Sequence, residues 1–253
     1  MINQPVIVQS SLPFDISKPV RLPGIAPLDP RKWVHVDEAY REQMSLRRAL
    51  IRDQPKDVIA YTPNALPAAQ ELLQTVLDHL PDGFKTTPGG ILAPDGHEFR
   101  VDIDRPLETI GSLVQEDMCL LQDMDGEHVL TAAVLCFPAS WLLSEKIERP
   151  LTHIHGAVAE YNDEIAKRVQ RLFDGVKPEK PLWRWNALWN DTPDLFQPRS
   201  VHDPRQPTDA GTEAFLRSER QCILRLPKTK AVVFSIHSFV LRHSDAQKAY
   251  CMT

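Results

Sequence analysis

Two histidines, placed two residues apart, are the most chemically distinctive feature of this chain. His153 and His155 stand in a break that contains Pro150 and Gly156, after a strand-like apolar run and before an amphipathic stretch. In a strand, residues i and i+2 point to the same side, so both imidazoles would reach one metal ion. The remaining histidines show no spacing that completes the ligand set of a metal hydrolase. Spacing alone leaves open a metal site and two polar residues bonded to nearby backbone.

A cluster of tryptophans is the second candidate for ligand contact. Trp183, Trp185 and Trp189 lie within seven residues, and Asn186 stands among them. Such a stretch can form a flat wall beside a porphyrin or a cation–π partner for an alkylammonium group. The alternative is a set of ordinary core aromatics on one side of a strand.

A charged run supplies the third group of candidates. Arg217, Glu219 and Arg220 lie at the entrance to the last expected hairpin. A guanidinium binds carboxylates in a two-pronged arrangement, and a carboxylate can hold a cationic substrate or relay a proton. His237 follows on the next strand and can serve in the same pocket. Structural ion pairs and a buried strand histidine are the alternatives.

Composition excludes several classes of protein. The chain has 253 residues, of which 42% are hydrophobic and 25% charged, as in soluble globular proteins with a substantial core. A net charge of −5 gives no reason to expect nucleic acid or an anionic membrane as a partner. No apolar run is long enough to cross a membrane and no secretory signal is present, so we expect a cytoplasmic protein. The four cysteines form no Cys-x-x-Cys pair, which disfavours an iron–sulfur cluster within this chain.

Hydrophobic periodicity predicts the elements that position these residues. Helical spacing predicts helices at 37–51, 64–80 and 159–173. Alternation predicts strands at 99–103, 118–121, 129–137, 183–189, 221–226 and 231–241. Turn residues at Asp125-Gly126 and at Pro227–Lys230 predict two hairpins.

This order of elements predicts an α+β fold, with one antiparallel sheet and helices packed on one of its faces. Residues 1–32 are rich in proline and lack periodicity, so we expect an extended arm there. Residues 33–253 are expected to form a single domain with helices at its N-terminal side. No Gly-rich loop follows a strand, which disfavours a nucleotide-binding Rossmann domain.

Six segments together resemble one known family. They are Cys136-Phe-Pro-x-x-Trp141, Glu145-Lys-Ile-x-Arg-Pro150, Ile154-His155-Gly-x-Val158, Asp194-Leu-Phe196, Arg217-x-Glu-Arg-Gln221-x-x-x-Arg-Leu-Pro227 and Val233-Phe-x-Ile236. On these segments the chain resembles the haem-dependent oxidative N-demethylase α-subunit family, from about residue 28 to residue 241. The resemblance implies a PAS-like haem-binding domain, with a curved antiparallel sheet.

The resemblance also implies a reaction and its partners. In this family an oxidoreductase of the monooxygenase type demethylates dimethylamine to methylamine and formaldehyde, using O2 and NADPH. Haem b is bound by this type of subunit, and flavin and a [2Fe–2S] cluster belong to separate reductase chains. A non-catalytic haem-binding PAS-type sensor of gas or redox state, an enzyme acting on another small methylated amine and a haem-free binding domain remain alternatives.

Residue by residue, the resemblance selects His155 as the axial iron ligand and leaves His153 as a rival. Ala157 and Ala159 replace two prolines of the family motif Ile-His-x-Pro-Val-Pro. The family often has a basic residue, commonly arginine, where His237 stands. We further expect three residues to contact the cofactor, namely Trp185, Asn186 and Arg217. Three others are the candidate catalytic residues, namely Glu219, Arg220 and His237.

Overall fold

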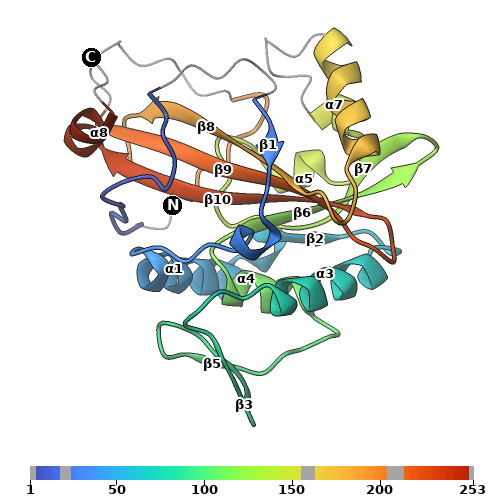
Figure 1. The fold of residues 1–253 in the computed structure, drawn as a ribbon, viewed down its shortest axis with the longest axis horizontal. Coiled ribbons are helices and arrows are strands. Elements are labelled where there is room, and N and C mark those ends of the chain that lie inside the picture. Colours follow the sequence, from blue (N-terminus) through green and yellow to red (C-terminus); the bar gives the residue numbers. More distant parts are fainter. Residues whose placement is uncertain (1–3, 18–23, 155–162, 204–213, 251–253) are drawn as a thin grey trace.

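A seven-stranded antiparallel sheet organises the chain in a computed structural model that describes residues 4–17, 24–154, 163–203 and 214–250 (Figure 1). The strand order is β1-β8-β9-β10-β6-β7-β2. The bounds are β1 Ala26–Pro27, β2 Ile59–Tyr61, β6 Asp117–Met124, β7 Glu127–Val134, β8 Leu182–Asn190, β9 Phe215–Arg225 and β10 Val232–Arg242. A separate small sheet contains β3 Lys85–Thr87, β4 Gly90–Leu92 and β5 Glu98–Phe99.

Both predicted hairpins are confirmed. β6 and β7 are joined at Asp125 and Gly126, which have φ angles of 55° and 86°. Positive φ at both central residues gives the turn a twist that matches the strands, and the Asp-Gly pair accepts this conformation readily. β9 and β10 pair along their whole length, from Phe215 opposite Arg242 to Arg225 opposite Val232.

Helices cover both faces of the large sheet (Figure 1). Leu50, Leu73 and Leu113 pack with Leu120 on one face. Leu143, Leu151 and Phe173 pack with Ile223 on the other. The α+β class is therefore confirmed, but the expectation of helices on a single face is wrong. The first face carries α1 Tyr40–Asp53, α3 Leu66–Asp78 and α4 Pro106–Leu113, and the second carries α5 Leu143–Lys146, α6 Leu151–Ile154 and α7 Asp163–Gly175.

The predicted helices at 37–51 and 64–80 correspond to α1 and α3. The third corresponds to α7 from residue 163 onward, and its first residues lie outside the described part of the chain. The predicted strand at 99–103 is wrong beyond Phe99, because the chain turns at 103–105 into α4, with Pro106 in its first turn. Among the described helices, none is long and apolar enough to cross a membrane.

The N-terminal residues contribute to the sheet and to one of its ends. β1 pairs with β8 at the edge of the sheet, and the Gln9 backbone N–H donates to the Val240 carbonyl at 2.8 Å. Farther along, the Leu12 N–H donates to the Tyr250 hydroxyl at 2.7 Å, which joins the arm to α8 His243–Tyr250. The remaining short helices are η1 Pro30–Lys32 and α2 Pro55–Val58. The predicted division between arm and domain at residue 32 stays a prediction.

Candidate functional site

Strand alternation divides six of the predicted site residues between the two faces of the sheet. Trp185 pairs with Arg220, which pairs with His237 in the next strand. Asn186 pairs with Glu219 in the same way. Directly paired residues share a face, and neighbours along a strand point to opposite faces. Trp185, Arg220 and His237 therefore share the face of α1, α3 and α4, and Asn186, Arg217 and Glu219 share the face of α5, α6 and α7.

Glu219 is the centre of the polar group on the second face. Its Oε2 accepts hydrogen bonds from Asn186 Nδ2 at 3.1 Å and from Gln221 Nε2 at 3.0 Å. Its Oε1 lies 3.6 Å from an Arg217 terminal nitrogen. The carboxylate is thus held by two amides on one oxygen, and the other oxygen has a looser cationic neighbour. Sequence reasoning missed the contact of Gln221, although this residue belongs to the quoted motif.

Arg217 is almost completely buried, with 4% of its surface exposed. Its terminal nitrogens donate to the Leu195 carbonyl at 3.0 Å and to the Phe137 carbonyl at 2.6 Å. Its Nε is buried and has no hydrogen-bond partner among the described residues. Burial lowers the pKa of this guanidinium, and the Glu219 and Asp117 carboxylates oppose that effect. A buried N–H without an acceptor is costly, so an acceptor at this nitrogen would stabilise the guanidinium.

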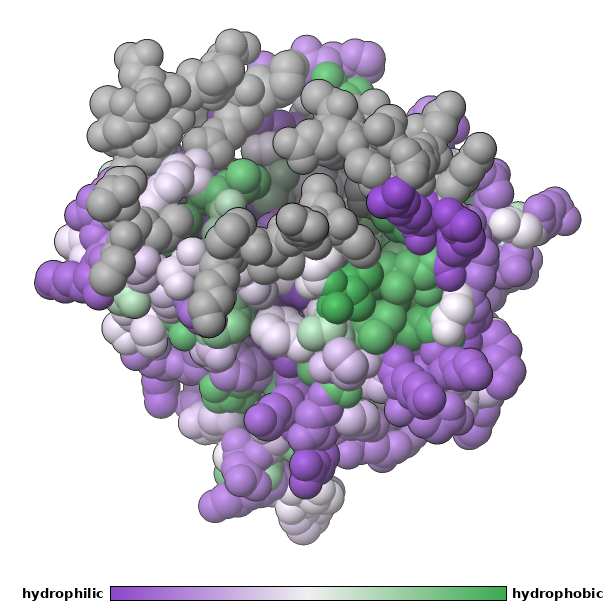
Figure 2. Space-filling view, turned by 45° about the horizontal axis from the view of Figure 1, so that its top comes forward, coloured by the Kyte–Doolittle hydropathy of each residue, from purple (hydrophilic) through white to green (hydrophobic). Residues whose placement is uncertain are grey.

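The helix α6, which carries His153, packs on the same face of the sheet. α6 packs here through Leu151 and ends at Ile154, whose carbonyl accepts a hydrogen bond from Lys146 Nζ at 2.6 Å. His155 comes directly after this helix and lies outside the described residues, together with Ala157 and Ala159. His153 lies within α6, and its side chain is exposed. Figure 2 shows apolar residues gathered into a patch beside the residues drawn in grey.

His237 lies on the first face, between two carboxylates. Its Nδ1 is 3.0 Å from Glu116 Oε1, and its Nε2 is 3.1 Å from Asp37 Oδ2. Burial alone would lower the pKa of His237, but the hydrogen bonds to Asp37 and Glu116 outweigh burial and raise it to about 9. The ring is therefore an imidazolium that donates from both nitrogens, and it has no lone pair left for a metal. Its partners were missed because they come from distant segments of the chain.

The other two predicted residues on this face also have structural partners. Arg220 donates to the carbonyls of Lys32 and Trp33, and its guanidinium lies 5.7 Å from the Trp183 ring centroid. Trp185 stacks on Phe14 with their ring centroids 5.9 Å apart. These contacts join the N-terminal residues to the sheet. Within the described residues, no three side chains of His, Cys, Asp or Glu come together in a way that could hold a metal ion.

Comparison with known families assigns the chain. A family model described as "Haem-dependent oxidative N-demethylase, alpha subunit-like" matches residues 24–251. The match covers the large sheet, both helical layers and all the predicted site residues. It confirms the resemblance found in the six sequence segments. The chain belongs to the haem-dependent oxidative N-demethylase α-subunit-like family.

Proposed function

We propose that this chain is the haem-binding, oxygen-using subunit of an oxidative N-demethylase that converts a small secondary amine such as dimethylamine to methylamine and formaldehyde. The observation that carries the proposal is the sharing of one sheet face by two features. The buried cation Arg217 lies beside Glu219 on this face, and α6 packs on it and ends one residue before His155. Two features separated by over 60 residues of sequence thus approach the same surface.

The residues on this face fit the chemistry of a haem. A haem has a flat apolar ring and two propionate groups. Leu143, Leu151 and Phe234 belong to an apolar cluster on the same face, and the unpartnered Nε of Arg217 suits a propionate. We assign His155 as the residue that would bind the haem iron, and a haem b held there would supply the one-electron and oxygen chemistry.

Glu219 is the group that we assign to the amine. One of its oxygens is fixed by Asn186 and Gln221, and the other lies 3.6 Å from a terminal nitrogen of Arg217. A secondary ammonium would pair with this less occupied oxygen, and the same carboxylate can take up the ammonium proton. Asn186 holds the carboxylate in place: its Oδ1 also accepts from the Glu219 backbone N–H at 3.1 Å.

The PAS-like character of the sheet is part of this proposal. Its five long strands form a continuous antiparallel unit, and the helical segment that leads to His155 is inserted between β7 and β8. Electrons would come from NADPH through a separate reductase containing flavin and a [2Fe–2S] cluster. The sequence supports this division of labour, since it contains neither a Cys-x-x-Cys pair nor a Gly-rich nucleotide loop.

An absorption spectrum tests the proposal. The full chain, expressed with a haem precursor, should show a Soret band that His155→Ala abolishes and that His153→Ala preserves. With a suitable reductase, NADPH and dimethylamine, the haem-loaded protein should release formaldehyde. A wild-type protein without a Soret band would overturn the assignment. Haem binding without formaldehyde from any small methylated amine would point to a sensor instead.

A further inference from the structure

Arg184 is a second arginine on the sheet face that carries Glu219. It pairs with Gln221 in β9, and Gln221 and Glu219 are two residues apart, so all three share this face. The Nε of Arg184 is buried and has no hydrogen-bond partner among the residues that the structure describes. Arg184 and Arg217 thus repeat the same feature on two neighbouring strands.

This row of residues has an excess of positive charge. Arg184 and Arg217 both interact electrostatically with the single carboxylate of Glu219. Asp117 also acts on Arg217, but its carboxylate is held by Arg47 at 2.6 Å and by the backbone N–H of Phe137 at 2.9 Å. Asp117 is therefore already neutralised, and the two guanidinium groups share the negative charge of one carboxylate.

Burial makes this excess costly. It lowers the pKa of Arg184 and of Arg217, and the charge of Glu219 only partly opposes the effect. A buried N–H without an acceptor loses the hydrogen bond that it made to water. A ligand carboxylate would supply both the missing acceptor and the missing charge, and the planar guanidinium fork matches its geometry.

We propose that Arg184 and Arg217 bind the carboxylate groups of the ligand of this site. The inference rests on the proposed function, in which the ligand is haem and the carboxylates are its two propionates. A carboxylate-bearing methylated amine would present the same chemistry from the substrate side. In either case Glu219 lies between the arginines and remains available to the ammonium group.

Haem dimethyl ester, in which both propionates are blocked, tests this assignment. The full chain, purified without haem, is titrated with haem and with the ester, and absorbance reports the dissociation constants. We expect wild type to bind haem about ten- to a hundredfold more tightly than the ester, as for loss of charge-assisted hydrogen bonds. Arg184→Met should weaken haem binding by a similar factor and leave ester binding unchanged. Arg184→Lys keeps the positive charge, so it should weaken haem binding less than Arg184→Met does. Arg242→Met is the matched control, because this arginine is exposed at the end of β10, and it should change neither constant.

The outcomes separate the two proposals. A wild type that binds neither porphyrin overturns the haem function itself. Equal binding of haem and ester, with Arg184→Met unchanged, excludes the propionates as the bound carboxylates and leaves haem binding intact; if N-methylglycine also has no effect on the spectrum, the carboxylate site is overturned. If N-methylglycine then shifts the spectrum of haem-loaded wild type but not that of Arg184→Met, the bound carboxylate belongs to the substrate. If Arg184→Met fails to fold, two measurements on wild type decide: the ratio of its affinities for haem and for the ester, and the spectral shift of the haem-loaded protein with N-methylglycine. Equal affinities together with no spectral shift overturn the inference.

Discussion

Glu219 and Arg220 are neighbours in strand β9, and their side chains lie on opposite faces of the sheet. Glu219 Oε2 accepts a hydrogen bond from Asn186 Nδ2 at 3.1 Å, whereas Arg220 donates to the Trp33 carbonyl at 2.9 Å on the other face. The six predicted residues in β8, β9 and β10 therefore form two groups with different partners. One group is a candidate ligand site, and the other joins the N-terminal residues and α1 to the sheet.

Paired substitutions in β8 should separate these groups. Asn186→Leu removes one of the two amide donors that hold the Glu219 carboxylate, so we expect an altered haem spectrum with amine and a roughly tenfold lower rate of formaldehyde release. Trp185→Phe changes a ring that stacks on Phe14 on the opposite face, so it should leave the haem spectrum with amine and the rate of formaldehyde release unchanged. Spectra and formaldehyde yields of the haem-loaded variants give the answer. Equal effects of the two substitutions would refute the assignment of the site to the Glu219 face.

The raised pKa of His237 makes stability dependent on alkaline pH. Its pKa rises from an ordinary 6.5 to about 9 on folding, because the bonds to Asp37 and Glu116 outweigh burial. Protonation of the native state therefore adds stability that is fully present below about pH 6.5 and is lost as pH rises through 9. We expect His237 to contribute about 2–3 kcal/mol to the fall in the free energy of unfolding between pH 7 and pH 10, as measured by urea denaturation.

A glutamine at position 237 should remove the contribution of this group. His237→Gln cannot ionise, so its unfolding free energy should be lower at pH 7 and should fall by about 2–3 kcal/mol less than that of wild type up to pH 10. The fall that remains comes from the buried thiols of Cys119, Cys136 and Cys222, because burial raises their pKa. His97→Gln is the matched control, because 61% of the His97 side chain is exposed, and it should keep the wild-type pH profile. A wild-type profile in His237→Gln would show that another group titrates.

Gly111 is required by packing between α1, α4 and β7. An added Cβ would lie 2.5 Å from a methyl carbon of Val134 and 2.8 Å from Ile51 Cδ1. Gly111→Ala should therefore destabilise the protein by about 1–3 kcal/mol through overpacking. Gly175, at the end of α7, has open space around its Cβ position, and Gly175→Ala should be neutral or slightly stabilising. Thermal unfolding of both variants tests whether Gly111→Ala is the more destabilising substitution. Equal melting temperatures of the two variants would contradict the packing requirement at Gly111.

Local patterns predicted much of the fold. Alternation and turn residues identified β6, β7, β8, β9 and β10, and helical spacing identified α1 and α3. The same signals missed α4, whose eight residues give too few turns for a clear period, and β2, which has only three residues. The two-sided packing of helices was also missed, because periodicity shows that a helix has an apolar face but not which side of a sheet it meets.

The candidate site was predicted less completely, for a related reason. The residue types were found, but their division between two faces depends on the register of β8 against β9, which only the folded sheet establishes. The partners of His237 come from positions 121 and 200 residues away, so no local pattern connects them. Arg184 was overlooked among the tryptophans because an unpartnered nitrogen is visible only in three dimensions.

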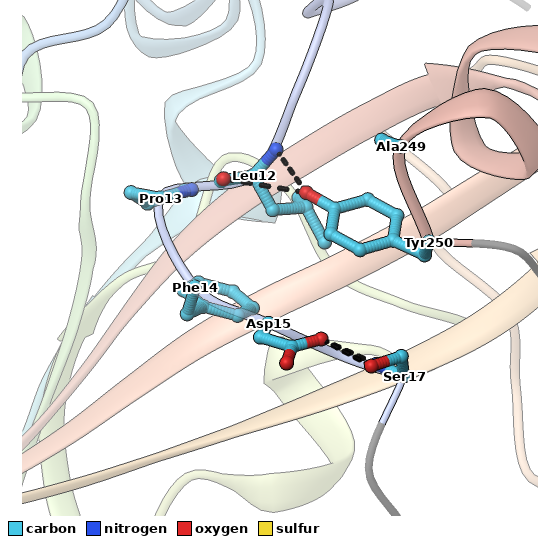
Figure 3. A pocket seen from close by; sticks show the side chains of 7 residues that line it. All are labelled: Leu12, Pro13, Phe14, Asp15, Ser17, Ala249 and Tyr250. Carbon is cyan, nitrogen blue, oxygen red and sulfur yellow. Dashed lines mark hydrogen bonds between the residues drawn. The ribbon is translucent and has the colours of Figure 1, made fainter.

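The contact between the N-terminal arm and α8 has a consequence for synthesis (Figure 3). In that view the Tyr250 hydroxyl is hydrogen-bonded to the Leu12 backbone, and Phe14 and Asp15 line a pocket together with Ala249. The Gln9 side chain likewise accepts a hydrogen bond from the backbone N–H of Val240, which lies 231 residues farther along the chain. At ordinary rates of translation the arm must remain without these partners for roughly 10–50 s on the ribosome. Its many prolines suit this interval, since they limit its ability to form a strand that a neighbouring chain could pair with.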